Sequence, residues 1–405
     1  MRIPLLIFLI ALLPAVAFAQ NSEITGKVRI AGTQTPIDQA NVFLSNSTAG
    51  TSTRTDGSFI LSGLKPGQYT LVVSIVGYDT YTKSVLVGSQ PINLDIELAQ
   101  SNTQLREVVI TTPADWKKNY EEFEKVFIGT DENAKYCTVI NPHIVTLQYH
   151  KSTQVLEAYT DDFLIVENLA LGYRVKFLLK SFEYDRLSGI IRYEGQQLFS
   201  ELKGSKKQVE IWHKNRRDTY YGSHMHFYRA LYQNKLDSEG FIVMKYTREL
   251  NPARPSEKVI RQKLKKFNDG MAVHRDSAIY WVGLAKMSKY YKEALDKKPT
   301  PAEEILQPTN QQGVYQVYFK GYNLYVVYTK KREKDDFQDM YRPLDMPNYQ
   351  TSVVSATEPY VIDSNGIVFG DSSPLYEGTW SKSRLSDLLP VDYVPDGPVM
   401  PDKDE

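Results

Sequence analysis

The feature that most constrains the fold is a period-two alternation of apolar and polar residues that runs from Ser22 to Leu98. Such alternation places successive side chains on opposite faces of a β-strand. In the clearest run, four side chains share one face: Tyr69, Leu71, Val73 and Ile75. Asp56-Gly57 and Pro66-Gly67 supply turns between the strands. The pattern predicts antiparallel strands that form a small β-sandwich over residues 22–98.

Several short motifs lie in the same region, among them Gly26-Lys27-Val28, Thr55-Asp56-Gly57-Ser58-Phe59, Pro66-Gly67-Gln68-Tyr69 and Val76-Gly77-Tyr78. With these motifs the region resembles the carboxypeptidase regulatory-like domain. The resemblance implies a transthyretin-like Greek-key β-sandwich, of the kind that precedes many TonB-dependent receptors in Bacteroidota. It implies no catalytic residue. The H-x-x-E pair of the zinc carboxypeptidases is missing, because none of the six histidines has a glutamate three residues later.

The first residues, MRIPLLIFLIALLPAVAFAQ, have the pattern of a secretory signal peptide over residues 1–19. Arg2 precedes an apolar run, and Ala17-Phe18-Ala19 forms a small-x-small cleavage signature. The run is shorter than the roughly 20 apolar residues that a membrane span needs. We expect an exported chain without a membrane span after cleavage, either periplasmic or associated with the outer membrane.

The charge balance and the cysteine count exclude several classes of protein. Lys+Arg and Asp+Glu both number 48, so the chain has no net field that would recruit nucleic acid. Cys137 is the only cysteine, which rules out an intramolecular disulfide. Its apolar neighbours favour an inert thiol over a nucleophile.

Residues 99–113 are predicted to be a linker followed by a strand. A similar stretch follows the sandwich in TonB-dependent receptors and resembles a TonB box, so it is a candidate partner-binding strand; its residues are Leu105, Glu107, Val108, Val109 and Ile110. The alternative is a strand that pairs within this chain.

Residues 114–393 are predicted to form a larger α+β domain, which makes the fold class mainly β with an α+β second domain. Capping residues predict helices that start after Thr112, Ser205 and Ser223. Further helices are expected around Leu264 and from Trp281 to Leu295, and strands, one pair joined through residues 320–323, are expected to follow. Asn365-Gly366 predicts a hairpin. The acidic, Pro-rich residues 394–405 predict a frayed tail.

The most concentrated polar cluster lies between Trp212 and Arg229. The first turn of a helix after Ser223, with nearby cations, is a candidate pocket for a carboxylate or phosphate; its residues are His213, Arg217, Ser223, His224, His226 and Arg229. A metal site is disfavoured because residues two apart on a helix point to different faces. In the alternative interpretation these groups tie the helices to the sheet through hydrogen bonds.

A second resemblance covers the segment from Phe127 through Phe241, which is similar to the domain that follows this sandwich in many exported Bacteroidota proteins. The motifs that carry it include Tyr221-Gly222-Ser223, His226-Phe227 and Gly240-Phe241. The resemblance supports the architecture. It implies no activity for this C-terminal domain of unknown function.

The sequence contains no nucleophile elbow, no H-E-x-x-H motif and no phosphate-binding loop. We therefore favour a non-enzymatic interaction protein of the cell envelope, with no cofactor, no metal and no nucleic-acid partner. Its expected partner is an envelope protein of the TonB-dependent receptor type. Two alternatives remain open: a periplasmic solute-binding protein or hydrolase with a site in the His213–His226 cluster, and an accessory to a TonB-dependent receptor.

Overall fold

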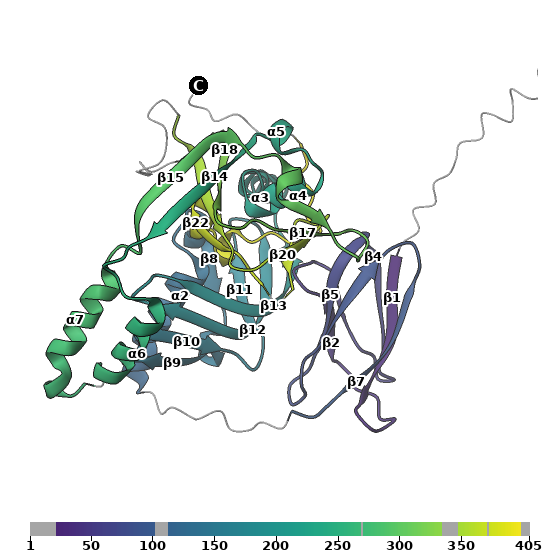
Figure 1. The fold of residues 1–405 in the computed structure, drawn as a ribbon. Helices are drawn as coiled ribbons and strands as arrows, with labels where there is room; N and C mark the ends of the chain where they lie inside the picture. The colour runs from purple at the N-terminus through teal and green to yellow at the C-terminus, as the bar shows by residue number, and fades with distance from the viewer. Residues whose placement is uncertain (1–21, 102–111, 269, 334–346, 371, 398–405) are drawn as a thin grey trace, which may run out of the picture.

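A computed structural model describes residues 22–101, 112–268, 270–333, 347–370 and 372–397 (Figure 1). The predicted signal peptide, the candidate strand from Leu105 to Ile110 and residues 398–405 of the tail lie outside these ranges. Within them, no helix has both the length and the apolar character needed to cross a membrane.

The N-terminal region is a two-sheet β-sandwich, as the alternation predicts. Its strands are β1 (Ser22–Ile30), β2 (Asn41–Leu44), β3 (Gly50–Ser52), β4 (Ser58–Leu64), β5 (Gly67–Ser74), β6 (Tyr81–Val87) and β7 (Ile92–Leu98). One sheet has the order β4-β1-β7 and the other β3-β2-β5-β6. The core lies between them and contains Tyr69, Leu71 and Val73 of β5. The predicted face of this strand is confirmed.

One strand pair differs from the prediction of antiparallel strands, since β1 and β7 are parallel, with Ile24 opposite Ile92 and Ile30 opposite Leu98. Period-two alternation reports which face is buried and carries no information about strand direction. The chain crosses from β6 in the other sheet before it enters β7, so β7 runs beside β1 in the same direction.

The outer face of the β2–β5 sheet is covered by the rest of the chain. Phe43 and Val72 on this face pack against Phe163, with ring centroids of the two phenylalanines 5.7 Å apart. The turn after β2 also pairs with a strand edge of the second domain: the Asn46 amide donates to the Gln197 carbonyl at 2.7 Å. These contacts fix the sandwich against residues 112–397, which we call the second domain.

The second domain is α+β and contains three sheets. Its helices are α2 (Pro113–Ile128), α3 (Lys206–Tyr220), α4 (His224–Tyr232), α5 (Leu236–Glu239), α6 (Glu257–Phe267), α7 (Arg275–Lys286) and α8 (Thr379–Lys382), and its short 3-10 helices are η1 (Asn133–Tyr136), η2 (Pro142–Ile144), η3 (Ala272–His274), η4 (Ala302–Glu304) and η5 (Leu385–Asp387).

The strands of the second domain alternate with these helices. They are β8 (Cys137–Val139), β9 (Thr146–His150), β10 (Val155–Tyr159), β11 (Leu164–Asn168), β12 (Tyr173–Asp185), β13 (Ile191–Glu201), β14 (Phe241–Leu250), β15 (Tyr290–Pro299), β16 (Leu306–Pro308), β17 (Val314–Val317), β18 (Asn323–Arg332), β19 (Tyr349–Ser355), β20 (Tyr360–Asp363), β21 (Val368–Phe369) and β22 (Leu375–Gly378). The first sheet has the order β8-β11-β12-β10-β9 with β13 on β12, the second β15-β14-β18-β19-β22, and the third β16-β17-β20-β21.

Helix α2 begins and ends where the sequence predicts. The Thr112 hydroxyl accepts the Asp115 amide, Pro113 occupies the first turn, and Gly129 ends the helix with a φ of 111°. The apolar side of α2 then packs on the first sheet, where Phe123 lies edge-on to Phe182 at 4.9 Å. Helix α2 and this sheet share one hydrophobic core.

The predicted caps of α3 and α4 are also confirmed. Ser205 and Gln208 form a reciprocal capping box, and the Ser223 hydroxyl accepts the His226 amide. The predicted Asn365-Gly366 turn joins β20 to β21. Gly366 has a φ of 73°, and a Cβ there would lie 2.5 Å from the Met225 carbonyl oxygen, so the turn requires glycine.

Two predictions in the second half were wrong, and one strand was missed. The expected helix from Trp281 to Leu295 ends at Lys286, and the strand β15 begins at Tyr290. The strands on either side of residues 320–323 do not form a hairpin, because β17 pairs with β16 and β20 whereas β18 pairs with β14 and β19. Strand β14, which lies between the helices, was missed.

Candidate functional site

The six residues of the predicted anion pocket lie on α3 and α4 but face different surroundings. His213 and Arg217 are one turn apart on α3 and contact the predicted tail. His213 Nδ1 lies 2.6 Å from Asp396 Oδ2, and Arg217 Nη1 lies 3.1 Å from Asp396 Oδ1. The Tyr221 hydroxyl donates to the Gly397 carbonyl at 2.6 Å. The carboxylate beside His213 and Arg217 thus belongs to the chain itself, because Asp396 and Gly397 of the predicted tail lie against α3 and Tyr221.

Arg229 faces the interior and joins three chain segments. Its guanidinium donates to the carbonyls of Asn365 (2.9 Å), Tyr393 (3.0 Å) and Val391 (2.8 Å). Val391 belongs to the core of the sandwich, so Arg229 links α4 to the β20–β21 turn and to the contact with the first domain. Because all three hydrogen bonds hold chain segments together, the Arg229 guanidinium has a structural role.

His226 is buried, with 3% of its side chain exposed. Its Nδ1 accepts the Gly222 amide at 3.2 Å, and its Nε2 lies 3.1 Å from Glu239. Burial lowers its pKa from 6.5 to about 4, although the hydrogen bond that Nε2 donates to Glu239 favours the charged form. Lys330 and Lys331 lower the pKa further. His226 is therefore a neutral hydrogen-bonding side chain at neutral pH.

The His226 contribution to stability is expected to disappear on acidification. The unfolded chain takes up a proton near pH 6.5 while the folded protein resists it down to about pH 4, so stability falls as the pH is lowered through this window. The pKa difference corresponds to about 3 kcal/mol at most. In urea unfolding, the wild type should be more stable than His226→Gln at pH 7, and this gap should narrow toward pH 4.5. A gap that is independent of pH would contradict the assignment.

His224 points away from His226, as expected for residues two apart on a helix. It lines a large cleft, and its ring stacks on Tyr376 with centroids 5.6 Å apart and an interplanar angle of 14°. Burial lowers its pKa to about 4, so the imidazole is neutral at neutral pH. Of the six predicted residues, His224 is the one whose ring faces the cleft.

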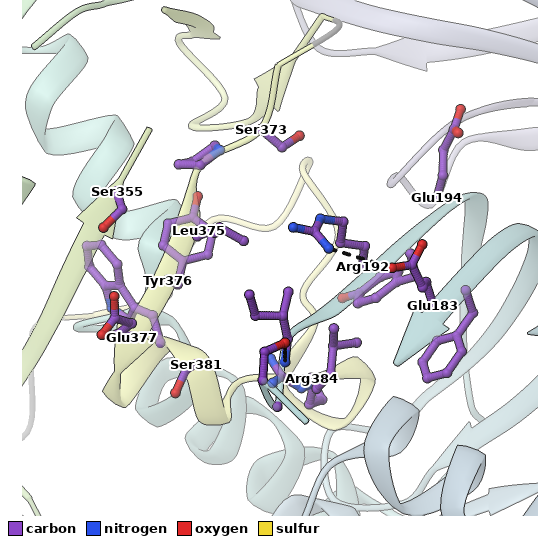
Figure 2. A pocket seen from close by; sticks show the side chains of 18 of the residues that line it. Glu183, Arg192, Glu194, Ser355, Ser373, Leu375, Tyr376, Glu377, Ser381 and Arg384 are labelled. Carbon is purple, nitrogen blue, oxygen red and sulfur yellow. Dashed lines mark hydrogen bonds and ion pairs between the residues drawn. The ribbon is translucent and has the colours of Figure 1, made fainter. Parts of the chain in front are cut away.

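The cleft has a volume of about 2540 Å³ and lies between the first and second sheets. Figure 2 shows Arg192 and Glu183, from β13 and β12, across the space from Leu375 and Tyr376 of β22, with Arg384 at its base. The lining also includes the start of α6 and the end of α7. A typical small-molecule pocket has roughly 300–1,000 Å³, so this cleft has room for an extended, chain-like ligand.

The charged side chains in the cleft are mostly paired with each other. Four arginines have an acidic partner: Arg192 with Glu183, Arg248 with Glu377, Arg254 with Glu257, and Arg261 with Asp185. Of the other lining glutamates, Glu194 pairs with Lys180 and Glu293 accepts a hydrogen bond from the Tyr246 hydroxyl, while Glu157 Oε2 lies 3.1 Å from His150 Nε2. Each lining glutamate of the described residues thus lies close to a basic or hydroxyl side chain.

Arg384 is different. Within the described residues its guanidinium makes one hydrogen bond, from Nη1 to the Ser383 carbonyl at 3.1 Å, and no ion pair. Burial lowers its pKa, while the neighbouring Tyr193 hydroxyl works in the opposite direction. A partly desolvated guanidinium without an acidic partner is a group suited to bind an anion, since its planar fork matches a carboxylate or phosphate.

The sequence reasoning missed Arg384 because it searched for clustered polar residues. The sequence carries no local signal for it, because Lys382, Ser383, Ser386 and Asp387 make its neighbourhood an ordinary polar segment. The sequence could not predict which cleft residues lie near Arg384, because the residues that line the cleft come from both the first and the second sheet.

Neither a metal site nor a reactive thiol is evident in the described ranges. These residues contain no group of three or more His, Cys, Asp or Glu side chains that could hold an ion. Burial, together with Asp131 and Asp387, raises the pKa of Cys137 to about 12. A thiol with this pKa is not a nucleophile at neutral pH.

Three solved structures show local similarity to this chain. A type II cohesin–X-dockerin complex from Acetivibrio cellulolyticus is 18% identical over 19% of this chain and 56% of that one (TM-score 0.17). A group B streptococcus pilus 2b backbone protein is 21% identical over 20% and 42% (TM-score 0.18). A Bacteroides fragilis protein of unknown function is 11% identical over 88% and 98% (TM-score 0.17). The chain thus spans about half the length of the first two, and scores this low carry no argument.

The family comparison concerns the sandwich. No curated protein matches the sequence. Residues 24–110 match the family model of the CarboxypepD_reg-like domain. The match covers β1 to β7, the strands that form the two sheets of the sandwich. The N-terminal β-sandwich of this chain is therefore a CarboxypepD_reg-like domain.

Proposed function

We propose that the protein is an exported, non-enzymatic binding protein of the cell envelope. Its cleft would hold an extended ligand that carries a carboxylate or phosphate. The observation that carries the proposal is the unpaired Arg384 in a cleft whose arginines otherwise have acidic partners. Because the lining glutamates also lie close to basic or hydroxyl side chains, binding is favoured over acid–base catalysis.

The location is a separate part of the proposal. It rests on the signal-peptide pattern of residues 1–19 and on the resemblance of the sandwich to modules of exported proteins. Fractionation of cells that express the full chain with a C-terminal tag tests it. Recovery in the periplasm or with the outer membrane supports export, and recovery of uncleaved protein in the cytoplasm would refute it without affecting the cleft.

Replacing Arg384 by glutamine should weaken ligand binding by about 10- to 100-fold, because a charge-assisted hydrogen bond contributes about 1.5–3 kcal/mol. Small molecules would be recovered from an envelope extract on the immobilised wild-type protein and identified by mass spectrometry. Their titration would then be repeated on the variants.

The matched control is Arg192→Gln, an arginine-to-glutamine change in the same cleft at a residue that is already paired with Glu183. It should retain most of the affinity. Equal losses of affinity in both variants would mean that binding depends on the net charge of the cleft and not on Arg384 in particular. An extract from which the wild type retains no anionic compound would overturn the proposed function.

A further inference from the structure

Helices α6 and α7 form a hairpin that projects from the body of the second domain, at the lower left of Figure 1. The two helices pack on each other through a small core of Ile260, Leu264 and Ala285, with Leu187 at its edge. At the root, Arg261 pairs with the buried Asp185 at 2.6 Å. At the other end of α6, Asn268 donates to the Lys151 carbonyl at 2.9 Å, so the hairpin is anchored along α6, and the start of α7 and the residues before it form its exposed tip.

The tip carries large apolar side chains that are exposed to solvent. Val273 is 81% exposed, Tyr280 62% and Ile279 60%. Met271, between them and α6, is also exposed. Single exposed apolar residues are common on surfaces, but four within ten residues at the end of a projecting hairpin form a group.

The same segment is strongly basic although the whole chain has no net charge. Residues 254–289 contain nine Lys or Arg against three Asp or Glu, a net charge of +6. Arg254 and Arg261 are paired at the root. The remaining basic residues include side chains that are exposed along the hairpin: Lys258, Lys265, Lys266, Arg275, Lys286 and Lys289.

Exposed apolar residues at a tip, surrounded by lysines, are the combination that binds a lipid surface. The apolar side chains enter the boundary between headgroups and acyl chains, and the lysines attract anionic headgroups. We propose that the α6–α7 hairpin binds the surface of an anionic phospholipid bilayer. Charge complementarity favours this partner, because the hairpin of an overall neutral protein combines a net charge of +6 with an exposed apolar tip.

Membrane contact through the hairpin would have a consequence for the cleft. Arg254, Glu257, Arg261 and Lys286, at the root of the hairpin, also line the cleft. A hairpin that lies on the bilayer would hold this end of the cleft close to the lipid surface. The inference does not depend on the proposed ligand, since the tip residues are outside the cleft.

Co-sedimentation of the full chain without residues 1–19 with sucrose-loaded vesicles tests the proposal. Vesicles of phosphatidylcholine alone would be compared with vesicles that also contain phosphatidylglycerol. We expect binding to the anionic vesicles, weaker binding at high salt because the charges are screened, and little binding to the neutral ones. Equal binding to both vesicles, or no binding to either, would overturn the proposal.

Two double variants and one control separate the contribution of the lysines to vesicle binding from that of the apolar side chains. Lys265→Glu with Lys266→Glu should reduce binding to anionic vesicles about tenfold or more, since each lysine near the surface contributes about 1 kcal/mol. Val273→Ser with Ile279→Ser removes apolar contact without a change in charge and should also reduce binding. Because the replaced side chains are exposed, the melting temperature of each variant should stay close to that of the wild type.

The control is Lys206→Glu with Lys207→Glu, which makes the same change in charge at two adjacent exposed lysines on α3. It should bind as the wild type does. If the control loses as much binding as the hairpin variant, attraction is a property of the whole protein and the assignment to the hairpin is wrong. Normal binding by the serine variant would mean that charge alone is responsible and would refute insertion of the tip.

Discussion

Replacing Arg229 by alanine is expected to lower the free energy of unfolding by about 3 kcal/mol, because three partly buried carbonyls lose a charged donor at once. These carbonyls belong to Asn365, Val391 and Tyr393, on two segments that are far from α4 in the sequence. The loss should appear in urea unfolding as a lower midpoint.

The control for this variant is Arg174→Ala. Arg174 also pairs with a carboxylate, Glu167, but its side chain is 48% exposed. Such surface pairs contribute about 0–1 kcal/mol, so this variant should stay close to the wild type. If Arg229→Ala is as stable as Arg174→Ala, then Arg229 is free for a ligand, as the sequence had suggested, and its structural assignment fails.

Replacing Arg216 by alanine should have a similar effect, a loss of about 3 kcal/mol. Arg216 is 4% exposed and lies 3.8 Å over the ring of Tyr173. It donates to the carbonyls of Leu171 at 2.7 Å and Gly172 at 3.3 Å, and it pairs with Glu201. It therefore attaches α3 to the turn between β11 and β12.

Arg216→Lys makes this prediction specific. A lysine keeps the charge but lacks the planar fork that reaches two carbonyls and a carboxylate together. It should restore only part of the stability, measured by the same urea unfolding. Full stability in the lysine variant would show that charge alone matters, and an alanine variant that loses less than about 1 kcal/mol would place Arg216 among ordinary surface arginines.

Part of the fold could be predicted from the sequence, and part of it could not. Local signals were reliable: the caps at Thr112, Ser205 and Ser223 are confirmed because a cap depends on residues within one turn. The alternation in β5 identified the buried face of the sandwich for the same reason. The direction of β7 and the partners of β17 and β18 were not predictable, since strand pairing depends on distant segments.

The candidate site was also only partly predictable from the sequence. The sequence placed His213, His224 and His226 in one cluster, but helical geometry turns them toward the tail, the cleft and the core. Arg384 lies in a short polar segment with Lys382 and Asp387, and nothing in that segment singled it out. Its importance depends on which acids approach the other cleft arginines, and two of these pairs, Arg248 with Glu377 and Arg261 with Asp185, join residues that are far apart in the sequence.

The most direct test of the central claim is a crystal structure of the wild-type protein bound to the compound recovered from the envelope extract. The account predicts electron density along the cleft between β13 and β22, with a carboxylate or phosphate oxygen within hydrogen-bond distance of the Arg384 guanidinium. Density in which the compound lies elsewhere, or occupies the cleft while Arg384 contacts only Ser383, would contradict it.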